Sequence, residues 1–280
     1  MSWKTQVVTG LTAVARTQPG RRVLHRGSRA GLVPWRVTNG IPIEGLFTVG
    51  VGAGFRYRST ARDWIGRNLF WAGLDRWEHE TFPEFIRLAK SARTFLDIGA
   101  NTGAYTLVAT AVNPALRAWA FEPVPETAAR LAEHVRLNDL DSRVIVVTDP
   151  VSDVAGPVSF YVAASPDESK IVAAAYGVGA VTMRATTVDD EVSEPVDLVK
   201  MDVEGGEVQV LRGMSRILKH DRPHLIIELL SDVAAQDVLA ALPDHYTLWH
   251  LSLNGLVPYT NVKPGKDRNY LCVPGGVGQP

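Results

Sequence analysis

The chain has 280 residues, of which 46% are hydrophobic, and its formal net charge is −1, values that are typical of one large globular domain and exclude a disordered or uniformly basic chain. A single cysteine, Cys272, excludes an internal disulfide and a multi-cysteine metal site. No apolar run reaches the roughly 18 residues that span a membrane and no secretory signal pattern opens the sequence, so we expect a cytoplasmic protein.

The N-terminal part of the sequence is basic. Residues 1–43 contain seven arginine and lysine residues, and the first acidic residue is Glu44. Residues 1–40 lack a periodic apolar face, and we interpret them as a solvated or partly helical leader. Its charge suits contact with an anionic membrane or a lipid-linked substrate. Nucleic-acid binding is not expected, because the rest of the chain is acidic and carries no motif for it.

The next segment is expected to form a lid. Residues 45–59 contain four glycines between apolar residues, which predicts one or two short strands. Apolar residues recur at helical spacing over 61–90, where Pro83 marks the start of the last predicted helix. These elements precede the first core strand, so we expect residues 1–90 to form a leader and a lid extension over a ligand cleft.

From Thr94 onward, predicted strands and helices alternate. The predicted elements are strand 94–98, helix 104–112, strand 118–121, helix 125–138, strand 144–148, strand 157–163, a small-residue loop 164–180, strand 181–186, helix 188–192, strand 196–203, helix 207–218, strand 224–230, helix 232–242 and strands 246–251 and 269–273. Such alternation predicts a mostly parallel sheet with right-handed crossovers. The last two strands can pair antiparallel at its edge.

The turn after the first core strand is the strongest functional signal. It reads Asp97-Ile-Gly-Ala-Asn-Thr-Gly103, and a strand, glycine turn and helix in this order hold a nucleotide-like ligand. Glu122 ends the next strand about 20 residues on, where an acid accepts the ribose hydroxyls. The spacing is GxxxG rather than GxGxxG, and Asp97 would repel a pyrophosphate. A ligand with an ammonium group and no phosphate, such as S-adenosylmethionine, fits better.

Further motifs make a resemblance specific. After Asp97-Ile-Gly-Ala-Asn-Thr-Gly come Phe121-Glu-Pro, then Lys200-Met-Asp-Val-Glu-Gly-Gly-Glu207, then Ile227-Glu228. With these motifs the chain resembles the FkbM family of S-adenosylmethionine-dependent methyltransferases, many of which O-methylate sugars or polyketide hydroxyls. The resemblance covers roughly residues 94–230, with His134 where the family often has asparagine and Gly206 where it usually has alanine.

The resemblance implies a fold and an activity. The fold is a Rossmann-like class I methyltransferase sheet, mostly parallel with an antiparallel C-terminal edge strand, and residues 91–280 would form the catalytic domain. The activity is O-methylation of a sugar, an oligosaccharide or glycolipid, or a polyketide-type natural product.

Seven residues are expected to bind the cofactor. Asp97, Gly99 and Asn101 would hold its amino-acid end, and Gly99 and Gly103 would permit close backbone approach; Glu122 would hold the ribose, and Asp149 with Val151 the adenine edge. Two simpler interpretations stay open. Asp97 could only cap the following helix, and Asp149 could only begin an Asp-Pro turn.

Asp202 and Glu204 are the catalytic candidates. They follow a buried strand that also contains Lys200, and alternation puts the three ionisable side chains on one face, which is costly outside a site. A carboxylate in hydrogen-bond reach could take the hydroxyl proton. Glu228 ends the next strand near the same cleft, and a divalent cation such as Mg²⁺ bridging Asp202 and Glu228 is an alternative that the resemblance does not require. His79, His134, His224 and His250 are expected to be structural.

Two other functions stay open at the level of sequence. The first is a nicotinamide-dependent oxidoreductase on a Rossmann-like fold, against which the GxxxG spacing counts. The second is a non-catalytic binding module on a methyltransferase fold, which would not need Asp97, Glu122, Asp202 and Glu204 together. The sequence indicates neither the identity of the acceptor nor an oligomeric state.

Overall fold

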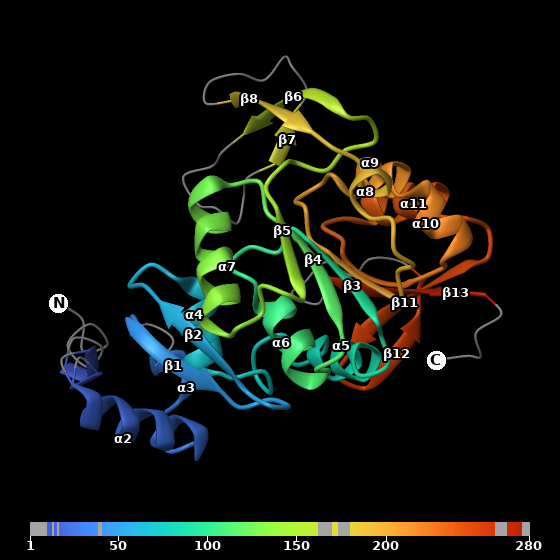
Figure 1. The fold of residues 1–280 in the computed structure, drawn as a ribbon. Coiled ribbons are helices and arrows are strands. Elements are labelled where there is room, and N and C mark those ends of the chain that lie inside the picture. Colours follow the sequence, from blue (N-terminus) through green and yellow to red (C-terminus); the bar gives the residue numbers. More distant parts are fainter. Residues whose placement is uncertain are drawn as a thin grey trace.

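The structure is a computed structural model that describes residues 10–12, 14–15, 17–38, 41–161, 170–172, 180–260 and 268–275. Its centre is an eight-stranded sheet of order β12-β11-β13-β10-β9-β3-β4-β5 (Figure 1). These strands are β3 Thr94–Ile98, β4 Arg117–Phe121, β5 Val144–Val147, β9 Leu198–Met201, β10 His224–Glu228, β11 Tyr246–Ser252, β12 Gly255–Pro258 and β13 Asn269–Pro274. The strands from β10 to β5 are parallel, whereas β13, β11 and β12 pair antiparallel. The predicted α/β fold, with its antiparallel C-terminal edge, is confirmed.

Helices cover both faces of the sheet, because successive residues of a strand point to opposite faces. Phe95 of β3 packs with α5, α6 and α7 on one face, and Leu96 packs with α8 to α11 on the other. The helices are α5 Phe82–Ala89, α6 Ala104–Val112, α7 Pro125–Leu137, α8 Val188–Glu191, α9 Glu207–Gly213, α10 Ser215–His220 and α11 Asp232–Ala241. The helix expected over 207–218 is therefore two helices, which meet at Met214.

The predicted lid elements are present. Strands β1 Gly45–Val49 and β2 Phe55–Ser59 form an antiparallel hairpin, followed by α4 Trp64–Trp71 and then by α5. Asp63 caps α4 by accepting a 2.8 Å hydrogen bond from the backbone nitrogen of Gly66. Buried residues of the hairpin and of α4 join the same hydrophobic cluster as α5 and α6, so the lid packs directly on the sheet domain.

The leader is partly helical. Helix α2 spans Gln18–Arg29, and α3 spans Trp35–Thr38. Leu24 of α2 is buried in a cluster with Phe70 and Trp71 of α4. Helix α2 agrees with the interpretation of residues 1–40 as a partly helical leader, whereas its packing on α4 through Leu24 was not predicted. Arg22 and Arg26 are exposed, and membrane contact through this basic segment stays a prediction.

A small second sheet follows β5. It has the order β7-β6-β8, formed by β6 Gly156–Tyr161, β7 Lys170–Val172 and β8 Ala180–Ala185. Two of these strands match the extended segments expected at 157–163 and 181–186. The predicted loop 164–180 contains β7, and most of the rest of it lies outside the described residues. Within the described ranges, none of the helices is long and apolar enough to cross a membrane.

Candidate active site

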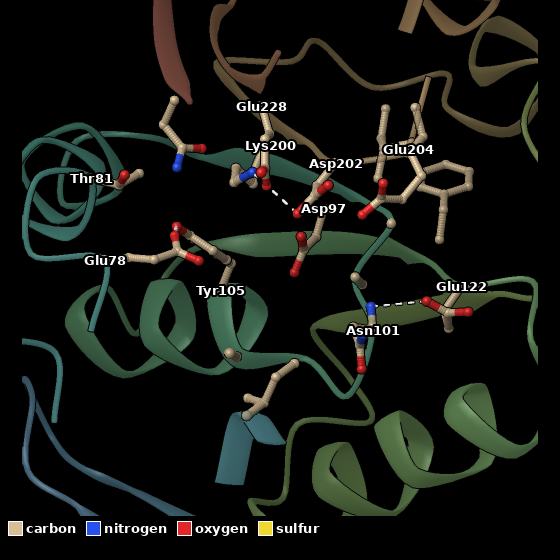
Figure 2. Close-up of a pocket in the computed structure, with 18 of the residues that line it drawn as sticks. Glu78, Thr81, Asp97, Asn101, Tyr105, Glu122, Lys200, Asp202, Glu204 and Glu228 are labelled. Atoms are coloured by element: carbon tan, nitrogen blue, oxygen red, sulfur yellow. Dashed lines mark hydrogen bonds and ion pairs between the residues drawn. The ribbon is translucent and has the colours of Figure 1, made fainter. Parts of the chain in front are cut away.

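A cavity of about 720 Å³ opens between the lid and the carboxyl ends of the central strands. Parallel α/β sheets bind ligands at this edge, where the strand order changes direction. The cavity is lined by nine of the ten residues singled out in the sequence: Asp97, Gly99, Asn101, Glu122, Asp149, Val151, Asp202, Glu204 and Glu228. Figure 2 shows Glu122 and Asn101 at one end of this site and Glu78 at the other.

Asp97 is buried at the end of β3 and faces the cavity. Its Oδ2 accepts hydrogen bonds from the backbone nitrogen of Thr106 at 2.9 Å and from Thr106 Oγ1 at 2.6 Å. The side chain therefore does cap α6, as the simpler interpretation proposed. Burial raises the pKa of Asp97 to about 6, although the bonds from Thr106 and the charge of Lys200 oppose this. Its role toward a cofactor stays a prediction.

The two glycines of the turn have different functions. Gly99 has a φ of 81°, and a Cβ placed there would lie 1.8 Å from the carbonyl oxygen of Asp202, so only glycine lets the two loops approach. Gly103 has a φ of 90°, and a Cβ there would lie 2.5 Å from Leu131 Cδ1 of α7. Gly103 is not among the residues that line the cavity, and its tight contact with Leu131 gives it a packing role, so cofactor contact by Gly103 stays a prediction.

Glu122 is oriented by the backbone around it. Its Oε2 accepts from the backbone nitrogen of Asn101 at 3.0 Å (dashed in Figure 2), and its Oε1 accepts from the backbone nitrogen of Val124 at 2.8 Å. The arrangement thus fixes an acceptor pair at the end of β4. Asp149 and Val151 line the cavity after the neighbouring strand, β5.

The loop after β9 brings the predicted catalytic residues to the cavity. β9 ends at Met201, so the extended strand is shorter than the predicted 196–203, and the chain turns at Glu204, whose φ is 54°. Lys200, Asp202 and Glu204 nevertheless all line the cavity. Lys200 is only 2% exposed, and its Nζ lies 3.9 Å from Asp202 Oδ2.

Asp202 and Glu228 form a coupled pair across β9 and β10. Burial, and after it the negative charge of Asp202, raises the pKa of Glu228 to about 8, and a hydrogen bond between the two side chains acts in the same direction. Lys200 opposes the shift. At neutral pH Glu228 therefore favours its protonated form.

Two residues of the site were missed by sequence reasoning. Glu78 lies in the lid, and its Oε2 accepts a hydrogen bond from Tyr105 Oη of α6. Tyr105 stacks on Phe82 with ring centroids 4.8 Å apart, and Lys200 Nζ lies 5.2 Å from the Tyr105 ring centroid. Burial raises the pKa of both Glu78 and Tyr105. No local pattern marks Glu78, because only the packing of the lid brings it to the strands.

The described residues offer little support for a metal site, and His134 makes structural contacts. Among the described residues, no group of three or more histidine, cysteine, aspartate or glutamate side chains could hold a metal ion. A cation bridging Asp202 and Glu228 therefore has no third protein ligand of these types in the described ranges. His134 is buried, contacts the carbonyl oxygen of Thr102 through Nδ1 at 2.8 Å and accepts from the backbone nitrogen of Arg58 at 3.2 Å, which supports its predicted structural role.

Comparisons with known proteins agree with the motifs. The family model described as the methyltransferase FkbM domain matches residues 97–246. The hexuronic acid methyltransferase AglP of Haloferax volcanii is 28% identical over 201 residues, which cover 70% of this chain and 77% of that protein.

Solved structures give weaker matches. Methyltransferase FkbM from Methylobacillus flagellatus has 18% identity and a TM-score of 0.44, covering 75% of this chain and 52% of that one. The O-methyltransferase TomG from Streptomyces achromogenes, solved with S-adenosylmethionine, has 15% identity and a TM-score of 0.40, covering 69% of this chain and 80% of that one. The chain thus spans about half the length of the first of these structures.

Proposed function

Because the chain belongs to the methyltransferase FkbM domain family, whose model matches residues 97–246, we propose that it transfers a methyl group from S-adenosylmethionine to a hydroxyl of a carbohydrate. Family membership supports S-adenosylmethionine-dependent methyl transfer, and it argues against the nicotinamide-dependent alternative. A sugar is favoured over a polyketide-type acceptor, because the curated relative is named for a hexuronic acid.

The cavity fits the chemistry of this cofactor. Gly99 lines the cavity, and the two oriented oxygens of Glu122 suit the two hydroxyls of a ribose. Asp149 and Val151 are assigned to the adenine edge, and Asn101 with Asp97 to the amino-acid end. S-adenosylmethionine carries a sulfonium and an ammonium group, and the many carboxylates that line the cavity complement these positive charges.

The position of Asp202 and Glu228 at the cavity, after β9 and at the end of β10, supports a hydroxyl as the acceptor group. An alcohol must lose its proton as its oxygen attacks, whereas a carboxylate acceptor is already ionised and would be repelled by the acidic cavity. Asp202 is assigned as the group that receives the hydroxyl proton, and Glu228 as its hydrogen-bonded partner. The cofactor supplies the electrophilic methyl group. The proton passes from the hydroxyl to Asp202 while the oxygen–methyl bond forms and the methyl–sulfur bond breaks, which leaves S-adenosylhomocysteine.

Glu204 is assigned a supporting role in this step. It lines the cavity beside Asp202, and its φ of 54° turns the chain two residues after Asp202. The same cavity could serve a protein that only binds ligands, so turnover decides between the two functions. Titration calorimetry should detect binding of S-adenosylmethionine and none of NAD. Incubation with S-adenosylmethionine and uronic acid glycosides should then give a methyl ether and S-adenosylhomocysteine; binding without turnover of any glycoside would favour a binding module.

A further inference from the structure

Negative charge is in excess around Lys200. Burial raises the pKa values of Glu78, Asp97, Glu207 and Glu228, and the charge of Lys200 opposes each rise. Its Nζ also lies 3.9 Å from Asp202 Oδ2, so one ammonium group faces five carboxyl groups. Buried carboxylates are costly unless positive charge compensates them. Arg76, the other arginine or lysine that lines the cavity in the described part of the chain, donates to the carbonyl oxygen of Ser28 at 3.0 Å. A cationic ligand group would therefore complete this site.

Glu78 is the member of this group that the lid contributes. Its φ of 47° places a glutamate in the left-handed region, which most non-glycine residues avoid. Such strain persists where the surrounding structure fixes the residue, and it clusters at functional sites. Tyr105 orients the carboxylate by donating to Oε2, while Phe82 and Phe85 hold the tyrosine ring between them at 4.8 Å each.

The position of Glu78 matches the amino-acid end of the cofactor rather than its nucleoside. Figure 2 shows Glu78 at one end of the site, Glu122 at the other, and Asp97 and Asp202 between them. A cofactor with its ribose on Glu122 and its amino-acid end past Asp97 extends toward Lys200 and Glu78. The ammonium group lies at that end, where Asp97 Oδ2 accepts from the backbone nitrogen and from Oγ1 of Thr106 and so holds α6.

We propose that Glu78 binds the α-ammonium group of S-adenosylmethionine, with Tyr105 as the positioning residue that holds its carboxylate. The inference rests on the proposed function, and it makes the lid part of the cofactor site as well as a wall of the acceptor site. The cofactor would then bind to the lid and the sheet domain together.

Titration calorimetry with two ligands tests this assignment without an acceptor. S-adenosylhomocysteine carries the amino-acid group, whereas methylthioadenosine has the same adenine, ribose and sulfur but lacks it. Glu78→Gln should weaken the affinity for S-adenosylhomocysteine by about 10- to 100-fold, the value of a charged hydrogen bond. It should leave the affinity for methylthioadenosine within about twofold of the wild-type value. Tyr105→Phe should give a smaller loss with the same split between the ligands.

Glu80→Gln is the matched control, because Glu80 lies two residues away, lines the same cavity and pairs with His79 at 3.0 Å. It should leave the affinity for both ligands unchanged. Unchanged S-adenosylhomocysteine affinity in folded Glu78→Gln, or an equal loss in Glu80→Gln, would overturn the proposal. If Glu78→Gln does not fold, Tyr105→Phe decides the question. Affinities of Tyr105→Phe for both ligands that equal those of the wild-type protein would then overturn the proposal. A wild-type protein that binds neither ligand would instead refute the proposed function itself.

Discussion

Replacing Glu228 by glutamine should change how the stability of the protein depends on pH. Burial first, and then Asp202, raises the pKa of Glu228 from 4.5 to about 8 in the folded protein. Between these pH values the folded state holds a proton that the unfolded chain has released. The contribution of this proton to the free energy of unfolding is complete below about pH 4.5 and is lost as the pH rises through about 8. The free energy of unfolding falls over this range by at most about 1.4 kcal/mol per pH unit.

Glutamine keeps the shape and the donor of the protonated acid but does not titrate. We therefore expect wild type and Glu228→Gln to be about equally stable near pH 5, and the variant to be more stable by about 2–4 kcal/mol near pH 8. Other raised carboxyl groups, such as Asp97, titrate in both proteins and largely cancel in the difference. Urea unfolding over this pH range measures the difference, with Glu126→Gln at an exposed position of α7 as the control. A difference between wild type and Glu228→Gln that does not change with pH would refute the protonated pair.

Further predictions concern the cofactor, the base, the leader and a metal. Glu122→Ala should weaken the binding of S-adenosylhomocysteine by about 1–3 kcal/mol in calorimetry, and unchanged affinity would contradict the ribose assignment. Asp202→Asn should reduce turnover about 10²- to 10⁴-fold at unchanged cofactor affinity, and Glu204→Gln should cost less; wild-type turnover in Asp202→Asn would move the base elsewhere. Leu24→Ala should lower the unfolding free energy by about 2–5 kcal/mol, and no change would show that α2 does not support the fold. A chelator should leave turnover intact, whereas a loss restored by Mg²⁺ would indicate a bridging cation.

The sequence predicted the sheet domain well because its signals are local. Strands β3 and β4 are short apolar runs, and the glycine turn between β3 and α6 follows directly from Gly99 and Gly103. The packing of helix α2 was not predicted because it depends on Leu24 meeting α4, which no local pattern in residues 1–40 reveals. A deletion of residues 1–40, which the leader interpretation would allow, is now expected to destabilise the protein.

The candidate site was predictable to the extent that it lies at strand ends. Glu122, Asp202 and Glu228 follow parallel strands, and the carboxyl ends of such strands meet at one edge of the sheet. The raised pKa of Glu228 needed the structure, because it depends on burial and on the proximity of Asp202 on the neighbouring strand. Glu78 could not be predicted either, since its place in the site depends on how the lid packs on α6.

Methyl transfer to a uronic acid glycoside, followed by mild alkali, tests the central claim most directly. A uronic acid offers both hydroxyl groups and a carboxyl group, and alkali removes a methyl ester but leaves a methyl ether intact. With isotopically labelled S-adenosylmethionine, we predict that the wild-type protein labels the sugar in an alkali-stable form and that Asp202→Asn loses most of this label. Alkali-labile label at wild-type rate in both proteins would show methylation of the carboxyl group, and it would contradict a role for Asp202 in removing a hydroxyl proton.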